Sequence, residues 1–405
     1  MIPFSPPYID QDVIDEVLDS LSSGWITSGP KVKLLEEEVS KLANVSRSVC
    51  VNSWTSGAIL VLKWFGIKEG DEVIVPAYTY SATALAVLHC GATPVMVDIC
   101  NDFTIDVSNI EKAITSKTKI IMPVDIAGLP CDYDSVNALV NKSSVKTLFC
   151  AGSEKQMQLG RILVISDAAH SIGALYKGAQ AGKFTDITIF SFHAVKNVTT
   201  AEGGAICLNL PDTFNVEEEY SLMKLYTLNG QNKDALAKSL AGGWKYDILF
   251  AGLKANMPDV CAAIGLAQIR KYNSLFIKER ERVALGYQSF FSKYEHFELP
   301  LLEDDSRKSC FHIYALRLKA CSEEQRDKVI DEITKTGVAV NVHFIPMPML
   351  TVFKTLGYKI EDYPVAYNNY SREISLPIYP QLTNEQIDFI CEVVLTSFKK
   401  VVLND

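Results

Sequence analysis

A lysine that follows a buried strand is the residue with the clearest potential for chemistry in this 405-residue chain. The segment SFHAVKNVTTAEGG (191–204) comes directly after an apolar run. It brings Ser191, His193 and Lys196 close together, ahead of two glycines that permit close backbone approach. A desolvated lysine is suited to forming a Schiff base with a carbonyl group. An ordinary loop lysine is the alternative, and this segment alone leaves both interpretations open.

A second candidate is the carboxylate of Asp167, which lies in ISDAAHS (165–171) after the apolar run RILV. It could cap a helix, bind a metal or pair with a ring nitrogen. Asp167 with His170 alone is a weak metal signal, because a metal site needs further ligands at suitable spacing, so we expect no metal. A carboxylate beside a pyridine nitrogen keeps that nitrogen protonated, and the ring can then accept electrons from a carbanion. The presence of Lys196 one strand later favours this last role.

Two more strand ends carry residues of interest. In VNSWTSGAILVL (51–62) a small polar turn opens a helix, where Thr55 and backbone N–H groups can cradle a phosphate. An N-cap without a ligand is the alternative there. Tyr80, in PAYTYSAT (76–83), could stack on a planar cofactor or pack in the core. No GxGxxG or complete P-loop occurs, which disfavours Rossmann and NTPase folds.

A sheet that is apolar on both faces would position these residues. Short runs rich in Val and Ile alternate with helical patterns from roughly residue 45 to 210. This alternation predicts an α/β fold, with a mostly parallel sheet flanked by helices and ligands at the carboxyl ends of its strands. The predicted strands are 48–52, 72–77, 93–99, 119–126, 161–169, 186–193 and 204–210, and predicted helices between them include 56–66 and 81–91.

The C-terminal region predicts a smaller α+β domain, because its strands and helices are segregated. We place the boundary so that residues 1–248 form a large cofactor-binding domain and residues 249–405 a small one. The stretch 141–161 is interpreted as a polar excursion before the strand that leads to Asp167. The elements expected in the small domain are a helix at 278–294, a strand at 312–320, a helix at 322–337 that Ser322 caps and Gly337 ends, and a helix at 384–402.

Composition narrows the class of protein. The net charge is −9 and no Lys/Arg block occurs, so a nucleic-acid partner is not expected. The ten cysteines form no CxxC pair, as is typical of free thiols in a reducing compartment. The N-terminus has no signal-peptide pattern and no apolar run is long enough for a membrane span. A cytoplasmic protein without a membrane partner is predicted.

Together these segments resemble the nucleotide-sugar aminotransferases of the DegT–StrS family, which have the type I fold of aspartate aminotransferase. The likeness covers nearly the whole chain, and the order and spacing of the motifs carry it. These motifs are SGWITSGPKVKLLEEEVS (23–40), the Thr55 turn, EVIVPAYTYSATALAVLHCGATPVMVDI, DAAHS, SFHAVK, AEGG, LKANMPDVCAAIGLAQI (253–269) and SLPIYPQLTNEQID (375–388).

The resemblance implies pyridoxal 5′-phosphate as cofactor and two catalytic residues. Lys196 would hold the cofactor as a Schiff base and move the proton, and Asp167 would pair with the pyridine nitrogen. Tyr80 would stack on the ring, with His170 near the phenolic oxygen.

The remaining cofactor and substrate contacts also follow from the resemblance. Ser191, Thr55 and the backbone at Trp54 would hold the phosphate. Lys254 and Asn256 would complete that site in the neighbouring subunit, which implies a homodimer with shared active sites. The predicted substrate-binding residues are His193 and His343, the latter in VHFIP.

Three features depart from the family pattern. The family usually has glycine where Trp54 stands, so the phosphate turn is expected either to differ in shape or to use Trp54 in packing the ring. Pro348 replaces the second His of an HYxPLH-like segment, so part of the sugar contact that the resemblance implies is open here. The 141–161 stretch is longer than in many relatives. One branch of the family carries His in place of the lysine and performs dehydration, and Lys196 argues against that branch.

The resemblance predicts transfer of an amino group from L-glutamate to a nucleotide-linked keto-sugar for surface polysaccharide. The best substrate prediction is a UDP-2-acetamido-4-keto-6-deoxyhexose aminated at C4, although relatives also aminate C3 and dTDP- or GDP-sugars. A pyridoxal-phosphate sugar dehydratase or lyase is one alternative. A non-catalytic cofactor- or sugar-binding regulatory protein is the other.

Overall fold

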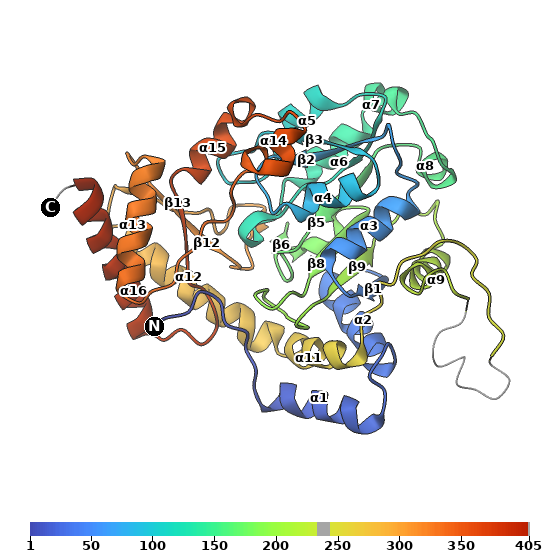
Figure 1. Cartoon of the computed structure of the whole chain (residues 1–405), viewed down its shortest axis with the longest axis horizontal. Coiled ribbons are helices and arrows are strands. Elements are labelled where there is room, and N and C mark those ends of the chain that lie inside the picture. The colour runs from blue at the N-terminus through green and yellow to red at the C-terminus, as the bar shows by residue number, and fades with distance from the viewer. Residues whose placement is uncertain (233–243, 404–405) are drawn as a thin grey trace.

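A seven-stranded sheet forms the centre of the larger part of the molecule (Figure 1). The computed structural model describes residues 1–232 and 244–403. The strand order is β1-β9-β8-β5-β4-β2-β3, and within it only β9 runs against its neighbours. The predicted α/β fold is confirmed and every predicted strand of this sheet is present, although β4 ends at Ile121, well before the predicted end at 126. The strands are β1 (Arg47–Val51), β2 (Glu72–Pro76), β3 (Thr93–Val97), β4 (Thr118–Ile121), β5 (Leu163–Asp167), β8 (Ile187–Ser191) and β9 (Gly204–Leu208).

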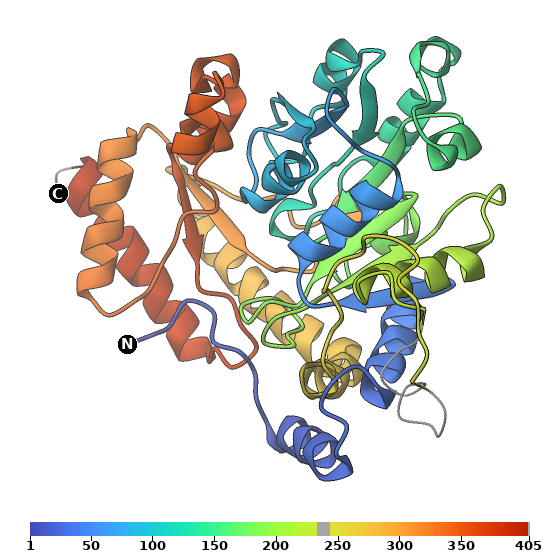
Figure 2. The ribbon, with the colours of Figure 1, turned by 45° about the vertical axis from the view of Figure 1, so that its right-hand side comes forward.

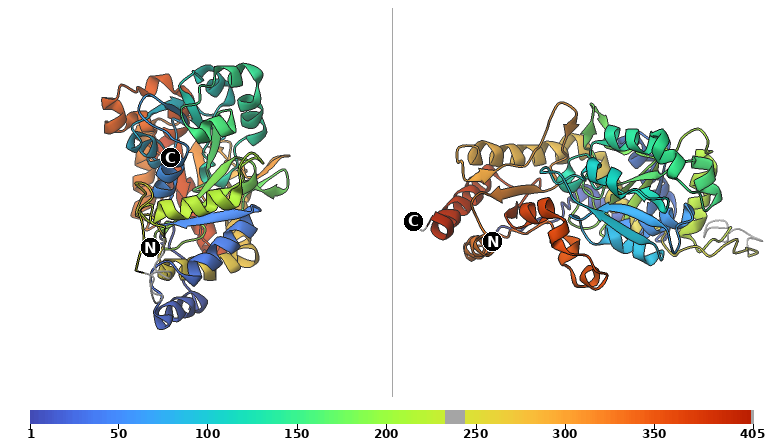
Figure 3. Two further views of the ribbon diagram at one scale, coloured as in Figure 1. Left: turned by 90° about the vertical axis from the view of Figure 1, so that its right-hand side faces the viewer. Right: turned by 90° about the horizontal axis from the view of Figure 1, so that it is seen from above.

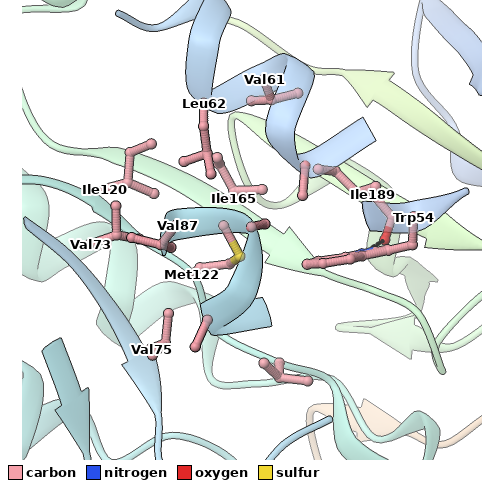
Figure 4. Close-up of a cluster of buried hydrophobic side chains, with 14 of the residues drawn as sticks. Trp54, Val61, Leu62, Val73, Val75, Val87, Ile120, Met122, Ile165 and Ile189 are labelled. Atoms are coloured by element: carbon pink, nitrogen blue, oxygen red, sulfur yellow. Dashed lines mark hydrogen bonds between the residues drawn. The ribbon is translucent and has the colours of Figure 1, made fainter. Parts of the chain in front are cut away.

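Helices cover both faces of this sheet because successive strand residues point to opposite sides. Val73 and Val75 of β2 lie in the core under α3 (Trp54–Trp64) and α4 (Ala82–His89), part of which is drawn in Figure 4. Ile74, between them, faces a separate core cluster. The helices on that opposite side include α5 (Val107–Ala113), α6 (Tyr133–Asn141), α2 (Pro30–Ala43) and α11 (Asp259–Arg270).

The C-terminal elements form a second layer beside the sheet (Figure 2). A three-stranded antiparallel sheet has the order β10-β12-β13 and packs with three helices around its own core. Ser322 caps its helix with a complete capping box, as predicted. The elements are β10 (Phe297–Glu298), β12 (Tyr314–Leu318), β13 (Glu373–Leu376), α12 (Ile277–Phe291), α13 (Glu323–Lys335) and α16 (Asn384–Phe398).

The two parts are joined at several points. Ile2 at the N-terminus pairs with Val338 and belongs to the C-terminal core. Conversely α11 packs against α1 (Gln11–Ser23) and α2, which belong to the N-terminal half of the chain. The helices α14 (Thr351–Thr355) and α15 (Pro364–Tyr370) lie over the edge of the large sheet near β3 (Figures 1 and 3). There the backbone N–H of Val365 donates to Asp98 at 2.9 Å. The domain division at residue 248 stays a prediction.

The predicted polar excursion at 141–161 contains two short helices, α7 (Ser143–Leu148) and α8 (Glu154–Leu159). Helix α9 (Val216–Thr227) follows the last strand of the large sheet. No helix in the described part of the chain is both long and apolar enough to cross a membrane. The remaining short strands are β6 (Leu175–Tyr176), β7 (Ala179–Gln180) and β11 (Arg307–Lys308).

Candidate active site

A cavity of about 450 Å³ opens at the carboxyl ends of β5 and β8. This is where an open α/β sheet places its ligands. All of the predicted site residues except two line it, although they come from five separate stretches of sequence. The residues that line it are Trp54, Thr55, Tyr80, Asp167, His170, Ser191, His193, Lys196 and His343. The two that do not are Lys254 and Asn256.

Asp167 lies at the floor of this cavity as the last residue of β5 and is almost fully buried. Its Oδ2 accepts a hydrogen bond from the Thr83 hydroxyl at 2.7 Å, and its Oδ1 accepts one from the Ala169 N–H at 3.2 Å. Burial raises the pKa of Asp167 to about 7, while these bonds and the nearby Lys196 charge act in the opposite direction. A cationic ring nitrogen placed here would favour the carboxylate form.

Lys196 reaches the same cavity from the loop after β8. Its backbone N–H bonds to the His193 carbonyl at 2.9 Å, so a tight turn fixes the base of the side chain. Burial lowers the pKa of the Lys196 amine to about 8, and the attraction of Asp167 only partly opposes this. A neutral, nucleophilic amine is therefore accessible near physiological pH.

The N-terminus of α3 lies at the cavity and has two free backbone N–H groups. Ser53 caps the helix by accepting the Ser56 N–H at 3.0 Å, whereas the N–H groups of Trp54 and Thr55 have no acceptor in the described part of the chain. Such free N–H groups at the positive end of a helix suit a phosphate. The Ser191 side chain lines the same cavity as the Thr55 turn.

The Trp54 side chain packs into the core. It is 6% exposed and its indole N–H donates to the Ile189 carbonyl at 3.1 Å (Figure 4). The turn is tight, because a Cβ on Gly204 would lie only 3.0 Å from the Trp54 nitrogen. Tryptophan in place of the family's usual glycine is therefore accommodated by core packing below the cavity.

Two buried histidines stand side by side at the cavity wall. The rings of His170 and His312 are 4.4 Å apart, and burial lowers the pKa of each well below the usual value. His170 Nδ1 accepts the Ala127 N–H at 3.3 Å, so the proton of the neutral ring sits on Nε2. His312 Nδ1 lies 2.9 Å from the Asn197 side-chain oxygen, so its proton sits on Nδ1. The pair thus offers one donor and one acceptor.

Tyr80, His193 and His343 form the more open side of the cavity. Tyr80 is 62% exposed, and its ring lies 5.8 Å from that of Phe344. His193 Nε2 lies 3.7 Å from Glu202. His343 stacks on Phe4 with ring centroids 5.3 Å apart. An exposed aromatic ring at the mouth leaves a face free for a planar ligand.

Lys254 and Asn256 lie outside the cavity of their own chain. The Lys254 ammonium bonds to the Asn256 side-chain oxygen at 2.6 Å, and Asn256 donates to the Ser28 hydroxyl at 2.7 Å. Among the described residues that line the cavity, Lys196 is the sole lysine or arginine. A phosphate in the cavity would therefore need a further cation from elsewhere.

Sequence reasoning missed several residues of this site. Thr83 is the second residue of α4, three positions after Tyr80, and the short distance along the chain was the available signal that it lies near the site. His312 begins the predicted strand 312–320 and looked like part of a half-buried sheet. Phe4 comes from an N-terminal segment whose sequence gives no sign that it approaches the site.

The chain belongs to the DegT/DnrJ/EryC1/StrS aminotransferase family, whose model matches residues 7–153 and 154–395. It is 35% identical to the spore coat polysaccharide biosynthesis protein SpsC of Bacillus subtilis, over 97% of this chain and 96% of that protein. It is 30% identical to the UDP-4-amino-4-deoxy-L-arabinose–oxoglutarate aminotransferase of Shewanella sediminis, over 96% and 95% of the two chains.

A solved structure also resembles this chain over nearly its whole length. Spr1654 of Streptococcus pneumoniae, assigned as a sugar aminotransferase, superposes in its PMP form with a TM-score of 0.95 at 43% identity, over 99% of this chain and 100% of that one. The protein is thus a sugar aminotransferase, and its cofactor is pyridoxal phosphate. The cavity fits that cofactor, with free N–H groups for the phosphate at one end and the buried carboxylate of Asp167 for the ring nitrogen.

Proposed function

We propose that this enzyme transfers the amino group of L-glutamate to a nucleotide-linked keto-sugar used for surface polysaccharide. The proposed acceptor is a UDP-2-acetamido-4-keto-6-deoxyhexose, aminated at C4. The names of the two relatives support this, since one acts in spore coat polysaccharide synthesis and the other on a UDP-linked 4-amino sugar with oxoglutarate. The observation that carries the proposal is the desolvated Lys196 amine in one cavity with the buried carboxylate of Asp167.

Bound pyridoxal phosphate supplies an electron-accepting ring that makes the Cα–H of the amino donor acidic. In this proposal the neutral amine of Lys196 takes that proton from Cα of L-glutamate, and later gives a proton to C4 of the sugar. Asp167, held by the Thr83 hydroxyl and the Ala169 N–H, keeps the ring nitrogen protonated throughout. Tyr80 packs on one ring face, and His170 donates from Nε2 toward the phenolic oxygen.

We further propose a homodimer in which Lys254 and Asn256 of one protomer complete the phosphate site of the other. The lack of a lysine or arginine other than Lys196 among the described residues of the cavity wall supports this, because a phosphate dianion needs more compensation than one helix terminus provides. The ten free thiols are consistent with a reducing compartment, and the cytoplasm is the proposed location.

Absorbance spectroscopy of the purified protein tests the first half of the reaction. The lysine-bound cofactor absorbs in the visible range, and L-glutamate should convert this band to that of the pyridoxamine form. Lys196→Ala should lack the lysine-bound band and lose about 10²- to 10⁴-fold in transfer rate, the usual contribution of a positioned acid–base group. Incubation of the pyridoxamine form with keto-sugars that differ in nucleotide and keto position then identifies the acceptor. Release of water or ammonia without amine transfer would instead indicate a dehydratase or lyase.

A further inference from the structure

A buried acid lies behind His343, on the side away from the cavity. Glu373 and Ser375 belong to β13, and both are fully buried. The His343 Nδ1 atom is 2.9 Å from the Ser375 hydroxyl, and that hydroxyl bonds in turn to Oε1 of Glu373. The second carboxyl oxygen of Glu373 accepts the backbone N–H of His343 at 3.1 Å. The three side chains form one continuous chain of hydrogen bonds that ends at the cavity.

The backbone holds this arrangement rigidly. Glu373 and Ser375 are two residues apart on a strand, so their side chains share one face of β13. Ser375 also exchanges two backbone hydrogen bonds with Asn341, at 2.8 and 3.1 Å, which fixes His343 two residues further on. The Tyr78 hydroxyl donates to the carbonyl oxygen of His343.

His343 has one ring nitrogen left for a ligand. Nε2 forms no hydrogen bond to any described residue, and it is not a fully buried atom. Since His343 lines the cavity and Nδ1 is turned toward Ser375, we infer that Nε2 faces the cavity. Burial lowers the pKa of His343 to about 4, with the Lys196 charge acting in the same direction, so the ring is neutral and carries one proton.

The charged groups around Glu373 leave its carboxyl group without a salt bridge. Arg317, its partner on β12, donates to Asn101 and Asn369 and pairs with Glu298. Arg326 of α13 donates to the backbone carbonyls of Tyr370 and Glu373, at 2.6 and 2.8 Å. Burial raises the pKa of Glu373 to about 8, while the bonds to Ser375 and the His343 N–H and the two arginines oppose this rise. Both protonation states are accessible near neutral pH.

The state of Glu373 dictates which nitrogen of His343 carries the proton. An ionised carboxylate can only accept, so Ser375 donates to it and accepts from Nδ1–H, which leaves Nε2 as an acceptor. A neutral carboxyl group donates to Ser375 through Oε1, because Oε2 is held by a backbone N–H. Ser375 then donates to Nδ1, and the proton moves to Nε2. The Ser375 hydroxyl group thus couples the protonation state of Glu373 to the tautomer of His343.

We propose that Glu373 acts through Ser375 as a positioning residue that sets whether the cavity-facing Nε2 of His343 donates or accepts a hydrogen bond. With neutral Glu373, Nε2–H is presented to an oxygen acceptor of the keto-sugar, such as its carbonyl group. With ionised Glu373, the same nitrogen can only accept from a hydroxyl group. The role in keto-sugar binding rests on the proposed function, whereas the relay itself does not.

Nitrogen-15 NMR of the histidine rings tests the relay without cofactor or substrate. The chain has six histidines, and loss of a signal in His343→Gln assigns the relevant one. In the wild type, the His343 proton should move from Nε2 to Nδ1 as pH rises through about 8. Glu373→Gln should keep the proton on Nε2 from about pH 6.5 to 9.5, because its amide oxygen stays with the His343 N–H and its NH₂ donates to Ser375. Ser375→Ala should abolish the linked movement.

Kinetics provide the second readout. The kcat/KM for the keto-sugar should fall about tenfold per pH unit above the pKa of Glu373 in the wild type, and this fall should be absent in Glu373→Gln. Two results would overturn the relay. One is a His343 proton that stays on the same nitrogen of the wild type from about pH 6.5 to 9.5. The other is a pH-dependent movement of that proton in Glu373→Gln or Ser375→Ala that matches the wild type. If the tautomer of His343 changes with pH but no amino group is transferred to any keto-sugar, the relay is supported and the proposed function is refuted.

Discussion

At the scale of single residues, Lys196 and Asp167 illustrate how burial and attraction compete within one cavity. The pKa of the amine falls to about 8 and that of the carboxyl group rises to about 7, so desolvation exceeds the mutual attraction for both groups. Both pKa values therefore lie near neutral pH, so each group can gain or lose a proton there. In the cofactor-free protein, burial therefore destabilises the charged form of Lys196 and favours the neutral amine that would react with the cofactor.

The pH dependence of stability should reveal this lysine. Its pKa is about 8 in the folded protein against 10.5 when unperturbed, so between these values the unfolded chain holds a proton that the folded chain has lost. Stability of the cofactor-free protein therefore rises with pH across this window, and the gain is absent below it. Urea unfolding measures the free energy of unfolding at each pH. Between about pH 7.5 and about pH 10 this free energy should rise more for the wild type than for Lys196→Met. Equal changes in both proteins would contradict the lowered pKa.

Thr83 should matter through the carboxylate that it holds. Thr83→Val removes the hydroxyl that donates to Asp167 at 2.7 Å while preserving the shape of the side chain. A hydrogen bond to a charged group is worth roughly 1.5–3 kcal/mol, so the rate of the L-glutamate half-reaction should fall by about 10- to 100-fold. Single-turnover absorbance measures this rate. Thr83→Ser keeps the hydroxyl and should stay near the wild type, and a rate for Thr83→Val equal to that of Thr83→Ser would remove Thr83 from the mechanism.

At the scale of elements, the N-terminus of α3 combines a structural cap with the proposed phosphate site. Ser53 bonds to the Ser56 N–H and thereby leaves the two preceding N–H groups, those of Trp54 and Thr55, free for a ligand. The cap of α13 uses the same chemistry far from the cavity, where Ser322 accepts the Gln325 N–H at 3.2 Å. The α13 terminus also has the reciprocal bond of a capping box, which α3 lacks, and only the α3 terminus lies at the cavity.

This pair of caps permits a controlled comparison. Ser53→Ala and Ser322→Ala should each lower the free energy of unfolding by about 1 kcal/mol, the usual value of an N-cap. Only Ser53→Ala should also weaken binding of pyridoxal phosphate, because it loosens the turn that presents the free N–H groups. Denaturant unfolding and a cofactor titration followed by absorbance measure the two effects. Unchanged cofactor affinity in Ser53→Ala would place the phosphate elsewhere.

The elements of the large sheet could be predicted because each strand is a short apolar run with a helix pattern after it. Residues that follow these strands, such as Asp167 and Lys196, could therefore be predicted as neighbours. His312, which lines the cavity just before β12, and Glu373, which lies behind His343 on β13, could not, because the packing of this second sheet against the first is a tertiary property. Glu373 in particular sits in a strand pattern where an acidic residue normally indicates a solvent-facing side.

At the scale of the whole molecule, the cavity is assembled from both parts of the chain and is still short of positive charge. Phe4, His343 and Ile378 come from the N-terminal segment and the C-terminal region, and close over the carboxyl ends of β5 and β8. The exposed Lys254 lies outside the cavity of its own chain, beside Asn256. In the proposed homodimer, Lys254 of the second protomer would supply a further cation to this cavity.

Mixed dimers test whether sites are shared. Lys196→Ala removes the reacting amine, and the double variant Lys254→Ala, Asn256→Ala should remove the contribution to the neighbouring phosphate site. If one protomer completes the site of the other, a hybrid of the two variants contains one intact site, with Lys196 from one chain and Lys254 and Asn256 from the other. Random mixing should then restore about a quarter of wild-type activity, since half of the dimers are hybrids with one good site of two. If all these residues served one chain, the hybrid would contain no intact site, and the activity would stay at the mean of the two parent variants.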